Sequence, residues 1–204
     1  MAAITLAALL LVSYLVGSIP FSFLIAKARG IDLRQVGSGN TGASNVWRNC
    51  GFLPFLVALA LDMAKGAAPT FVASSIAHTS PIWTMIVGMC AMLGHLFPIF
   101  LRFKGGKAVA TAGGVLFAIQ PGLFVLAALV WTAVFKLKGY PSLASLSAAV
   151  IVAVAGTWLA YTGHFPMIFA GYIWVALVLV VYMHRSNIQR LLAGQEMGIG
   201  PRTK

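Results

Sequence analysis

The sequence predicts an all-α protein that crosses a membrane several times. Of its 204 residues, 60% are hydrophobic and only 8% are charged, whereas a soluble domain carries about 25% charged residues. Five apolar stretches reach or approach the roughly 20 residues that a membrane-spanning helix needs, and they cover 2–26, 53–76, 81–101, 142–161 and 164–183. We therefore expect one integral membrane domain that comprises residues 1–204.

The first apolar stretch, 2–26, is expected to remain as a span. A secretory signal peptide has basic residues before its apolar run and a small-residue cleavage site after it. Here the basic residues Lys27, Arg29 and Arg34 follow the run instead. Because Lys and Arg mark the cytoplasmic ends of spans, the N-terminus should lie on the periplasmic side.

The apolar stretch 108–135 does not fit one crossing. As a single helix it would be about 42 Å long, against about 30 Å for the hydrocarbon core. Basic clusters flank it at 102–107 and 136–138, so both of its ends should face the cytoplasm. We expect a hairpin of two short helices of similar length, 108–119 and 123–135, which turns at Gln120-Pro121-Gly122.

The hairpin completes a count of seven transmembrane helices, with a periplasmic N-terminus and a cytoplasmic C-terminus. In this topology the basic loops and the tail from Arg185 onward lie inside, and the outer loops contain no Lys or Arg. Lys65 is the only basic residue away from a cytoplasmic end. This asymmetry agrees with the positive-inside rule.

The net charge of +11, from 14 Lys and Arg against 3 Asp and Glu, indicates an anionic partner. Lipid head groups and phosphorylated small molecules fit, whereas nucleic acid does not, because the cations occupy short loops rather than one broad face. The two cysteines, Cys50 and Cys90, lack the spacing of a metal site. Magnesium is bound through carboxylates, and the chain has only three Asp and Glu residues, with no acidic cluster. We therefore expect no metal and no cofactor.

A glycine-rich loop after the first span contains the first motif, residues 37–48. Glycine lets backbone N–H groups approach an anion, and a loop that opens a helix points these groups at it. A flexible linker with helix-capping Ser and Asn is the alternative. The expected binding residues are Gly37, Ser38, Gly39, Asn40, Gly42, Asn45 and Arg48.

The second motif, Lys104-Gly-Gly-Lys107, precedes the helix that contains Thr111. Its glycines free the backbone where that helix starts, and Lys107 extends from the first turn, as an anion site requires. We expect Lys104, Gly105, Gly106, Lys107 and Thr111 to bind phosphate. The motif is not a P-loop, because that spacing is absent and no strand precedes it. A basic cluster that only fixes the topology is the alternative.

A third candidate segment, from His184 to Glu196, follows the last span. His184 and Asn187 are three residues apart, which places them on one face of a helix, and an imidazole can transfer a proton near neutral pH. Stop-transfer cations with an interfacial helix are the alternative.

Polar residues within the spans are further candidates, because an isolated charge there costs about 2.5–3.5 kcal/mol. Asp62 and Lys65, at i and i+3, should pair and face the interior, either as structure or as part of the site. His95 is either a site residue or a satisfied buried histidine. Ser142 is expected to cap the helix that it begins, and both it and Ser145 are candidates for a phosphate contact.

Taken together, these motifs resemble the bacterial acyl-phosphate:glycerol-3-phosphate acyltransferase family (PlsY type). They occur in order over nearly the whole chain. The H-x-x-x-x-D pattern of many other acyltransferases is absent, since no Asp stands five residues after any of the four histidines. The resemblance rests on Ser38-Gly-Asn-Thr-Gly-Ala-Ser-Asn45 with Arg48, Asp62-Met-Ala-Lys65-Gly66, Gly94-His95 to Lys107, Ser142-Leu-Ala-Ser145, and His184 to Glu196.

The resemblance implies transfer of a fatty acyl group from acyl phosphate to the 1-hydroxyl of glycerol 3-phosphate, which gives lysophosphatidic acid for phospholipid synthesis. It implies a multi-pass protein of the bacterial inner membrane whose site faces the cytoplasm. Its partners would be acyl phosphate, glycerol 3-phosphate and membrane lipids, and we expect a monomer. It also implies a structural role for Glu196 and catalytic roles for Ser38, Arg48, Lys107, His184 and Asn187.

Three positions depart from the pattern of the family. Ala108 stands where the second motif usually has Gly, Ser44 where Thr is usual, and Ser186 where Glu is usual. Alanine is readily accommodated at a helix start, so we expect a small effect of Ala108. Ser44 keeps the hydroxyl group, and no role of the missing acid passes to Ser186.

An acyl phosphate is already activated, so we expect direct attack by the glycerol hydroxyl, with phosphate as the leaving group. Cations and loop N–H groups would stabilise the developing charge. The base is either His184 or the phosphate of the substrate itself. A transporter of phosphorylated metabolites is the rival class, but it needs a polar path to both faces, and the outer side is almost bare of polar clusters.

Overall fold

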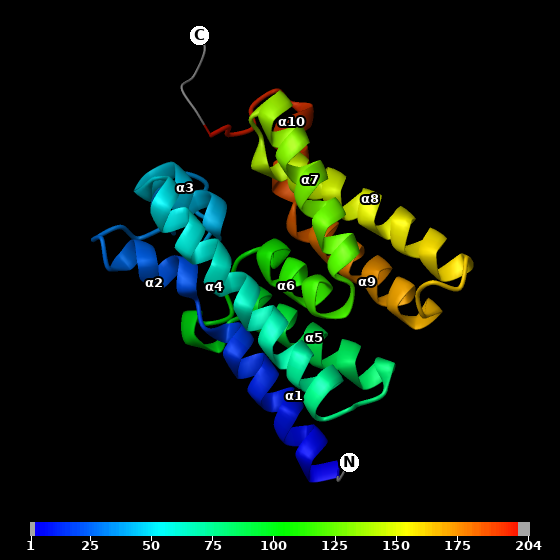
Figure 1. Ribbon diagram of the computed structural model, residues 1–204. Helices are drawn as coiled ribbons and strands as arrows, with labels where there is room; N and C mark the ends of the chain where they lie inside the picture. Colours follow the sequence, from blue (N-terminus) through cyan, green and yellow to red (C-terminus); the bar gives the residue numbers. More distant parts are fainter. Residues whose placement is uncertain (1–2, 200–204) are drawn as a thin grey trace. The chain divides into compact units, whose positions relative to one another are not determined.

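The computed structural model describes residues 3–199, and this part of the chain is helical with no strands. Besides the α-helices there are a π-helical turn, Val72–Ile76, and a 3-10 turn, Ile99–Leu101. The α-helices (Figure 1) are α1 Ala3–Ser18, α2 Phe21–Lys27, α3 Ala43–Cys50, α4 Phe52–Phe71, α5 Pro81–Leu96, α6 Val109–Ile119, α7 Pro121–Lys138, α8 Pro141–Tyr161, α9 Met167–Met183 and α10 Arg185–Leu192.

The helices form two compact units, one up to Gln120 and one from Pro121. In the first unit α4 packs along α6 and α1 packs along α5 (Figure 1). Glycines allow these close approaches: a Cβ atom on Gly114 of α6 would collide with the Met63 carbonyl of α4, and one on Gly94 of α5 with the Tyr14 carbonyl of α1. Small residues at helix contacts are typical of membrane proteins, because packing rather than the hydrophobic effect holds their helices together.

The sequence predicts one span over 2–26, and the candidate span Ile4–Lys27 agrees with it. The helix within this span, however, is interrupted. It is broken between α1 and α2 at Ile19 and Pro20. Proline has no N–H group and disfavours the helical conformation of the residue before it. The break brings the polar side chains of Ser18 and Ser22, both buried, beside the ends of the two helices.

Within residues 3–199, five segments are long and apolar enough to span a membrane, and the bent pair α9 and α10 would make a sixth. The predicted spans 53–76, 81–101 and 142–161 agree with them closely, while the predicted 164–183 begins later, at Met167. The five segments are Ile4–Lys27, Phe52–Ile76, Pro81–Leu101, Pro121–Lys138 and Pro141–Tyr161.

The stretch 108–135 is interrupted at Gln120, where the sequence places a turn, but its two arms are unequal. Helix α6 has 11 residues and α7 has 18, so the prediction of two short helices is wrong for the second. Pro121 and Gly122 lie within the first turn of α7, because proline is favoured at a first helical position. The arms belong to different units, and the hairpin and the count of seven spans remain predictions.

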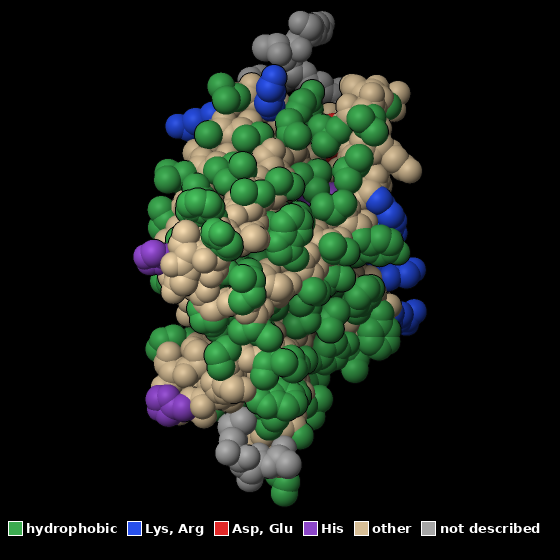
Figure 2. Space-filling model, turned by 90° about the vertical axis from the view of Figure 1, so that its right-hand side faces the viewer, with side chains coloured by type: hydrophobic (Ala, Val, Ile, Leu, Met, Phe, Trp, Pro, Cys, Tyr) green, Lys and Arg blue, Asp and Glu red, His purple; other side chains and the backbone are tan. Residues whose placement is uncertain are grey.

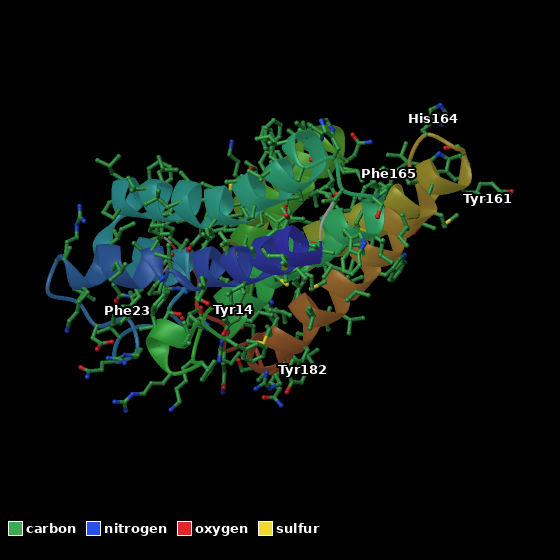
Figure 3. All side chains as sticks on the ribbon, turned by 90° about the horizontal axis from the view of Figure 1, so that it is seen from below. Tyr14, Phe23, Tyr161, His164, Phe165 and Tyr182 are labelled. Atoms are coloured by element: carbon green, nitrogen blue, oxygen red, sulfur yellow. The ribbon has the colours of Figure 1, made fainter. Side chains whose placement is uncertain are left out.

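In the second unit α8 packs against both α7 and α9. Large apolar side chains such as Val154 and Val178 are more than half exposed, which fits contact with lipid. Hydrophobic side chains also cover much of the face seen in Figure 2, with Lys and Arg near its edges. Exposed Tyr161 ends α8 and exposed Tyr182 lies near the end of α9 (Figure 3). Tyrosine is enriched at membrane interfaces, so these positions fit the ends of spans.

Candidate active site

The first motif folds around the buried amide of Asn45. Its Nδ2 atom lies 3.0 Å from each of the carbonyl oxygens of Leu33, Val36 and Asn40. Its Oδ1 atom accepts the N–H of Ser38 at 3.1 Å and an N–H of Asn49 at 3.0 Å. Both ends of the Asn45 amide are thus used to shape the loop, which opposes the predicted contact with the ligand.

The glycines of the first motif also shape the loop. Gly37 and Gly39 have φ angles of +57° and +68°, which favour glycine, and a Cβ atom on Gly37 would collide with the Asn45 side chain. The N–H of Gly42 donates to Oδ1 of Asn40 at 2.9 Å, so neither group is directed to a ligand. Ser38 and Arg48 are half-buried, the latter in the last turn of α3.

The glycines of the second motif hold their turn against the end of α5. The N–H of Gly105 donates to the Leu96 carbonyl at 3.2 Å, and that of Gly106 to the His95 carbonyl at 3.1 Å. A Cβ atom on Gly105 would collide with the His95 carbonyl, and one on Gly106 with the His95 ring. Glycine is thus needed here for close packing, and these contacts oppose the predicted binding of phosphate by the two N–H groups.

Ala108, which was expected to begin the helix over 108–119, lies one residue before α6, and Lys107, which was expected in its first turn, lies before the helix as well. Ala108 has a φ angle of +57°, a left-handed conformation that costs an alanine about 1–2 kcal/mol. The usual glycine would adopt it without this strain. Lys104 is exposed and Lys107 is half-buried on the two sides of the glycine pair.

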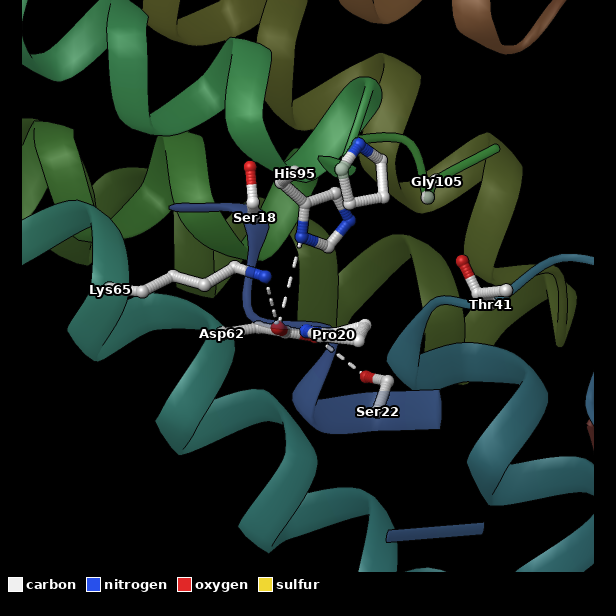
Figure 4. Close-up of a pocket in the computed structure, with 10 residues that line it drawn as sticks. Ser18, Pro20, Ser22, Thr41, Asp62, Lys65, His95 and Gly105 are labelled. Atoms are coloured by element: carbon white, nitrogen blue, oxygen red, sulfur yellow. Dashed lines mark hydrogen bonds and ion pairs between the residues drawn. The ribbon is translucent and has the colours of Figure 1, made fainter. Parts of the chain in front are cut away.

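Five buried side chains form what we call the charge cluster: Ser22, Asp62, Lys65, His95 and Thr111. Asp62 pairs with Lys65 at 2.8 Å and accepts the Ser22 hydroxyl at 2.6 Å (Figure 4). Nδ1 of His95 lies 3.7 Å from the Asp62 carboxylate and 3.2 Å from the Thr111 hydroxyl. The predicted pairing of Asp62 with Lys65 is confirmed. Thr111 contacts His95 and is fully buried, which opposes its predicted contact with phosphate.

A small cavity of about 10 Å³, with room for about one water molecule, joins the two motifs. Thr41 of the first motif and Gly105 and Gly106 of the second line it, together with Asp62, Lys65 and His95 (Figure 4). The two glycine-rich loops thus lie at the same end of the first unit. The sequence analysis missed Ser18, Pro20 and Ser22, which also line this cavity; a proline between two serines in an apolar run was the available signal.

In the second unit Glu196 joins three polar side chains. Oε1 accepts the Ser142 hydroxyl at 2.8 Å and an N–H of Asn187 at 2.6 Å, and Oε2 accepts the Nε–H of Arg190 at 2.9 Å. Ser142 does not cap α8, whose N-cap is Tyr140 without a side-chain hydrogen bond. Glu196 thus fixes Asn187 and Ser142, as its expected structural role requires.

The remaining two candidates of the second unit are Ser145 and His184. The Ser145 hydroxyl donates to the Pro141 carbonyl at 2.8 Å and accepts the indole N–H of Trp131 at 3.1 Å, which opposes its predicted contact with phosphate. His184 lies where the helix bends by 61°, between α9 and α10, so it does not share one straight helix with Asn187.

Nδ1 of His184 lies 2.8 Å from the Val180 carbonyl. A carbonyl oxygen only accepts, so this contact places the proton on Nδ1 and leaves Nε2 as the lone-pair atom of the neutral ring. Among residues 3–199, no three His, Cys, Asp or Glu side chains lie together as a metal site would need.

Comparison with known proteins decides the family. The family model described as glycerol-3-phosphate acyltransferase matches residues 7–194. The chain belongs to the glycerol-3-phosphate acyltransferase family. Among its relatives of that name, the protein of Roseiflexus sp. (strain RS-1) is 48% identical over 189 residues, which is 93% of each chain. The protein of Aquifex aeolicus (strain VF5) is 41% identical over 192 residues, 92% of this chain and 96% of the relative.

Two crystal structures of PlsY (YgiH), an integral membrane glycerol 3-phosphate acyltransferase, have the same fold as this member of the family. The glycerol 3-phosphate form is 39% identical, with a TM-score of 0.88 and 96% coverage of both chains. The lysophosphatidic acid form is 37% identical, with a TM-score of 0.87 and the same coverage.

Proposed function

We propose that this chain transfers a fatty acyl group from acyl phosphate to the 1-hydroxyl of sn-glycerol 3-phosphate. Acyl transfer to glycerol 3-phosphate is the activity of the family, and the related crystal structures are of a glycerol 3-phosphate form and a lysophosphatidic acid form. This pair of forms, substrate and product of one acylation, is the observation that carries the proposal. Acyl phosphate as the donor is inferred from the resemblance of the motifs.

The reaction needs no covalent intermediate. The glycerol oxygen forms a bond to the acyl carbon, the bond between that carbon and the phosphate oxygen breaks, and the hydroxyl proton leaves with a base. Both reactants and the leaving group carry phosphate, so positive charge both binds them and stabilises the transition state.

In the first unit we assign phosphate binding to side chains rather than to glycine N–H groups. Arg48 offers a planar fork that matches phosphate oxygens, and Lys104 and Lys107 offer ammonium groups on either side of the glycine pair. Ser38 adds a hydroxyl from the loop that Asn45 shapes. The cavity lined by both motifs supports placing these groups at one end of the unit.

In the second unit we assign His184 and Asn187 to the reaction. The contact of His184 with the Val180 carbonyl favours a lone pair on Nε2, which is the form a base requires. The phosphate of the substrate is the alternative base. In a His184→Gln variant, loss of the acidic limb of the pH profile of kcat would identify His184, while an unchanged profile with retained activity would leave the substrate phosphate as the base.

We further propose a monomeric, multi-pass protein of the bacterial inner membrane with its site on the cytoplasmic side. The apolar helices support the membrane location. The concentration of Lys and Arg in the two motif loops and in the C-terminal segment supports the orientation. Cysteine labelling of the 37–48 and 102–107 loops in sealed inverted vesicles would test it, and accessibility on opposite sides would refute it.

The activity is tested with purified protein, radiolabelled glycerol 3-phosphate and one of three donors: acyl phosphate, acyl-CoA or acyl carrier protein. We expect lysophosphatidic acid with acyl phosphate alone. Lys107→Ala should lower turnover by about 100-fold or more, as the loss of a charge-stabilising group does, while the buried control Ser13→Ala should not. Product from acyl-CoA but not from acyl phosphate would refute the assignment of the donor.

A further inference from the structure

The charge cluster reaches the second motif through His95, whose ring lies against Gly106. This contact indicates what the cluster does. We propose that Asp62, Lys65 and His95 are positioning residues that fix the conformation of the 104–107 turn. This turn then holds the ammonium groups of Lys104 and Lys107 in place to bind the phosphate of the acyl donor. The identity of that donor rests on the proposed function. The effect on the turn itself does not.

The position of the turn is set by the last turn of α5. In the 104–107 turn, the N–H of Gly105 donates to the Leu96 carbonyl at 3.2 Å and that of Gly106 to the His95 carbonyl at 3.1 Å. The imidazole ring of His95 fills the space next to Gly106, where a Cβ atom would collide with Nε2. A rotation of this ring would therefore displace Gly106, and Lys107 follows it directly in the chain.

The orientation of the His95 ring is in turn set by two partners of Nδ1. The Thr111 hydroxyl of α6 lies 3.2 Å away, and the Asp62 carboxylate of α4 lies 3.7 Å away. The negative carboxylate favours the tautomer with its proton on Nδ1. His95 is only 7% exposed, so beyond the one-water cavity beside it few other partners can replace a lost one.

Asp62 is itself fixed from two directions. Lys65 pairs with one carboxylate oxygen at 2.8 Å, and the Ser22 hydroxyl donates to the other at 2.6 Å. The Lys65 ammonium also donates to the carbonyl of Ile19, at 2.8 Å, where the chain breaks between α1 and α2. The contacts thus run without a gap from this break through α4 and α5 to the glycine pair.

A positioning role explains why charges occupy this site. Removing two charges from water costs free energy that their attraction often does not repay, so apolar residues of the same volume would stabilise the helices equally well. Directional contacts, however, specify one orientation for each group. The cluster supplies them to a ring that abuts the phosphate-binding turn.

The first test measures the turn without any substrate. The double variant Asp62→Asn/Lys65→Met removes both charges together, so no lone buried charge remains. Hydrogen–deuterium exchange of peptides covering 97–108 should become faster by about tenfold or more in this variant. Ser13→Ala is the matched control, since it deletes a buried α1–α5 hydrogen bond to the Val87 carbonyl, two turns before His95. Unchanged exchange in the double variant would overturn the proposal.

The second test measures kinetics on the same proteins. The double variant should raise the KM for acyl phosphate about tenfold and leave the KM for glycerol 3-phosphate within about twofold, whereas Ser13→Ala should change neither. Equal loss for both substrates, or faster exchange with unchanged KM values, would overturn the link from the cluster to donor binding.

A third pair of variants applies if the double variant does not fold. Thr111→Val keeps the shape of the side chain but removes the partner of His95, and Thr111→Ser restores the hydroxyl. Only the first should loosen the turn and raise the KM for acyl phosphate. If the wild-type protein makes no product from acyl phosphate, the proposed function fails, while the exchange experiment still accepts or rejects the positioning of the turn.

Discussion

The amide of Asn45 offers the sharpest test of how the first motif is built. Replacing it with alanine removes every contact of the side chain at once. The Nδ2 group has two N–H donors for three carbonyls at 3.0 Å, and Oδ1 accepts two N–H groups. That makes four full hydrogen bonds, worth about 1 kcal/mol each.

Because part of this loop is exposed, water will satisfy some of the freed groups, and we expect a net cost of about 2–4 kcal/mol. Local opening of the loop should then increase by roughly 30-fold to 1,000-fold, at tenfold for each 1.4 kcal/mol. The assay is hydrogen–deuterium exchange of peptides covering 31–45, with trypsin cleavage after Arg34 as a second measure of opening.

Asn49→Ala serves as the graded control for Asn45→Ala. It removes the amide that donates to the Asn45 carbonyl at 2.8 Å and to Oδ1 at 3.0 Å but leaves the three carbonyl contacts in place, so it should cost about 1 kcal/mol. If Asn45→Ala left exchange as slow as in the wild type and yet abolished binding of glycerol 3-phosphate, Asn45 would be a ligand residue and our assignment would be wrong.

Three further outcomes follow from packing and charge. Gly114→Ala should lower the thermal midpoint, because overpacking against α4 costs about 1–3 kcal/mol, while Gly171→Ala, which meets open space, should not. Glu196→Gln should lower both the thermal midpoint and kcat, because its cationic partner loses a counter-charge, and full activity would contradict the role of this carboxylate. Hydrogen bonds from Arg34 hold the pKa of half-buried Asp32 at about 2. Its stabilising contribution should therefore be constant above about pH 4, the usual pKa of an Asp, and decline as the pH falls toward 2. A carboxyl NMR titration should show a higher pKa in Arg34→Gln.

The spans could be predicted because the length and apolar composition that a span needs are properties of each segment alone. The stretches 53–76, 81–101 and 142–161 needed no knowledge of their neighbours, and the structure agrees with them to within a few residues. The break at Pro20 was missed because a window of apolar residues averages over one proline. The unequal arms around Gln120 were missed because proline was taken as a turn residue rather than as the first residue of a helix.

The site was harder to predict because hydrogen-bond partners are a tertiary property. A glycine pair such as Gly105 and Gly106 permits close approach either to an anion or to a neighbouring helix, and the sequence alone does not distinguish the two. Only the position of the α5 carbonyls shows that their N–H groups are already used. The same reasoning applies to Asn45 and Thr111, whose polar atoms looked available in the sequence and are buried in the fold.

The pairing of the acids narrows the choice of catalytic base. The chain has three Asp and Glu residues, and each is in an ion pair: Asp32 with Arg34, Asp62 with Lys65, and Glu196 with Arg190. Each carboxylate thus already has a cationic partner within 3 Å. These contacts make a carboxylate a weaker candidate for the base than the imidazole of His184 or the phosphate of the substrate.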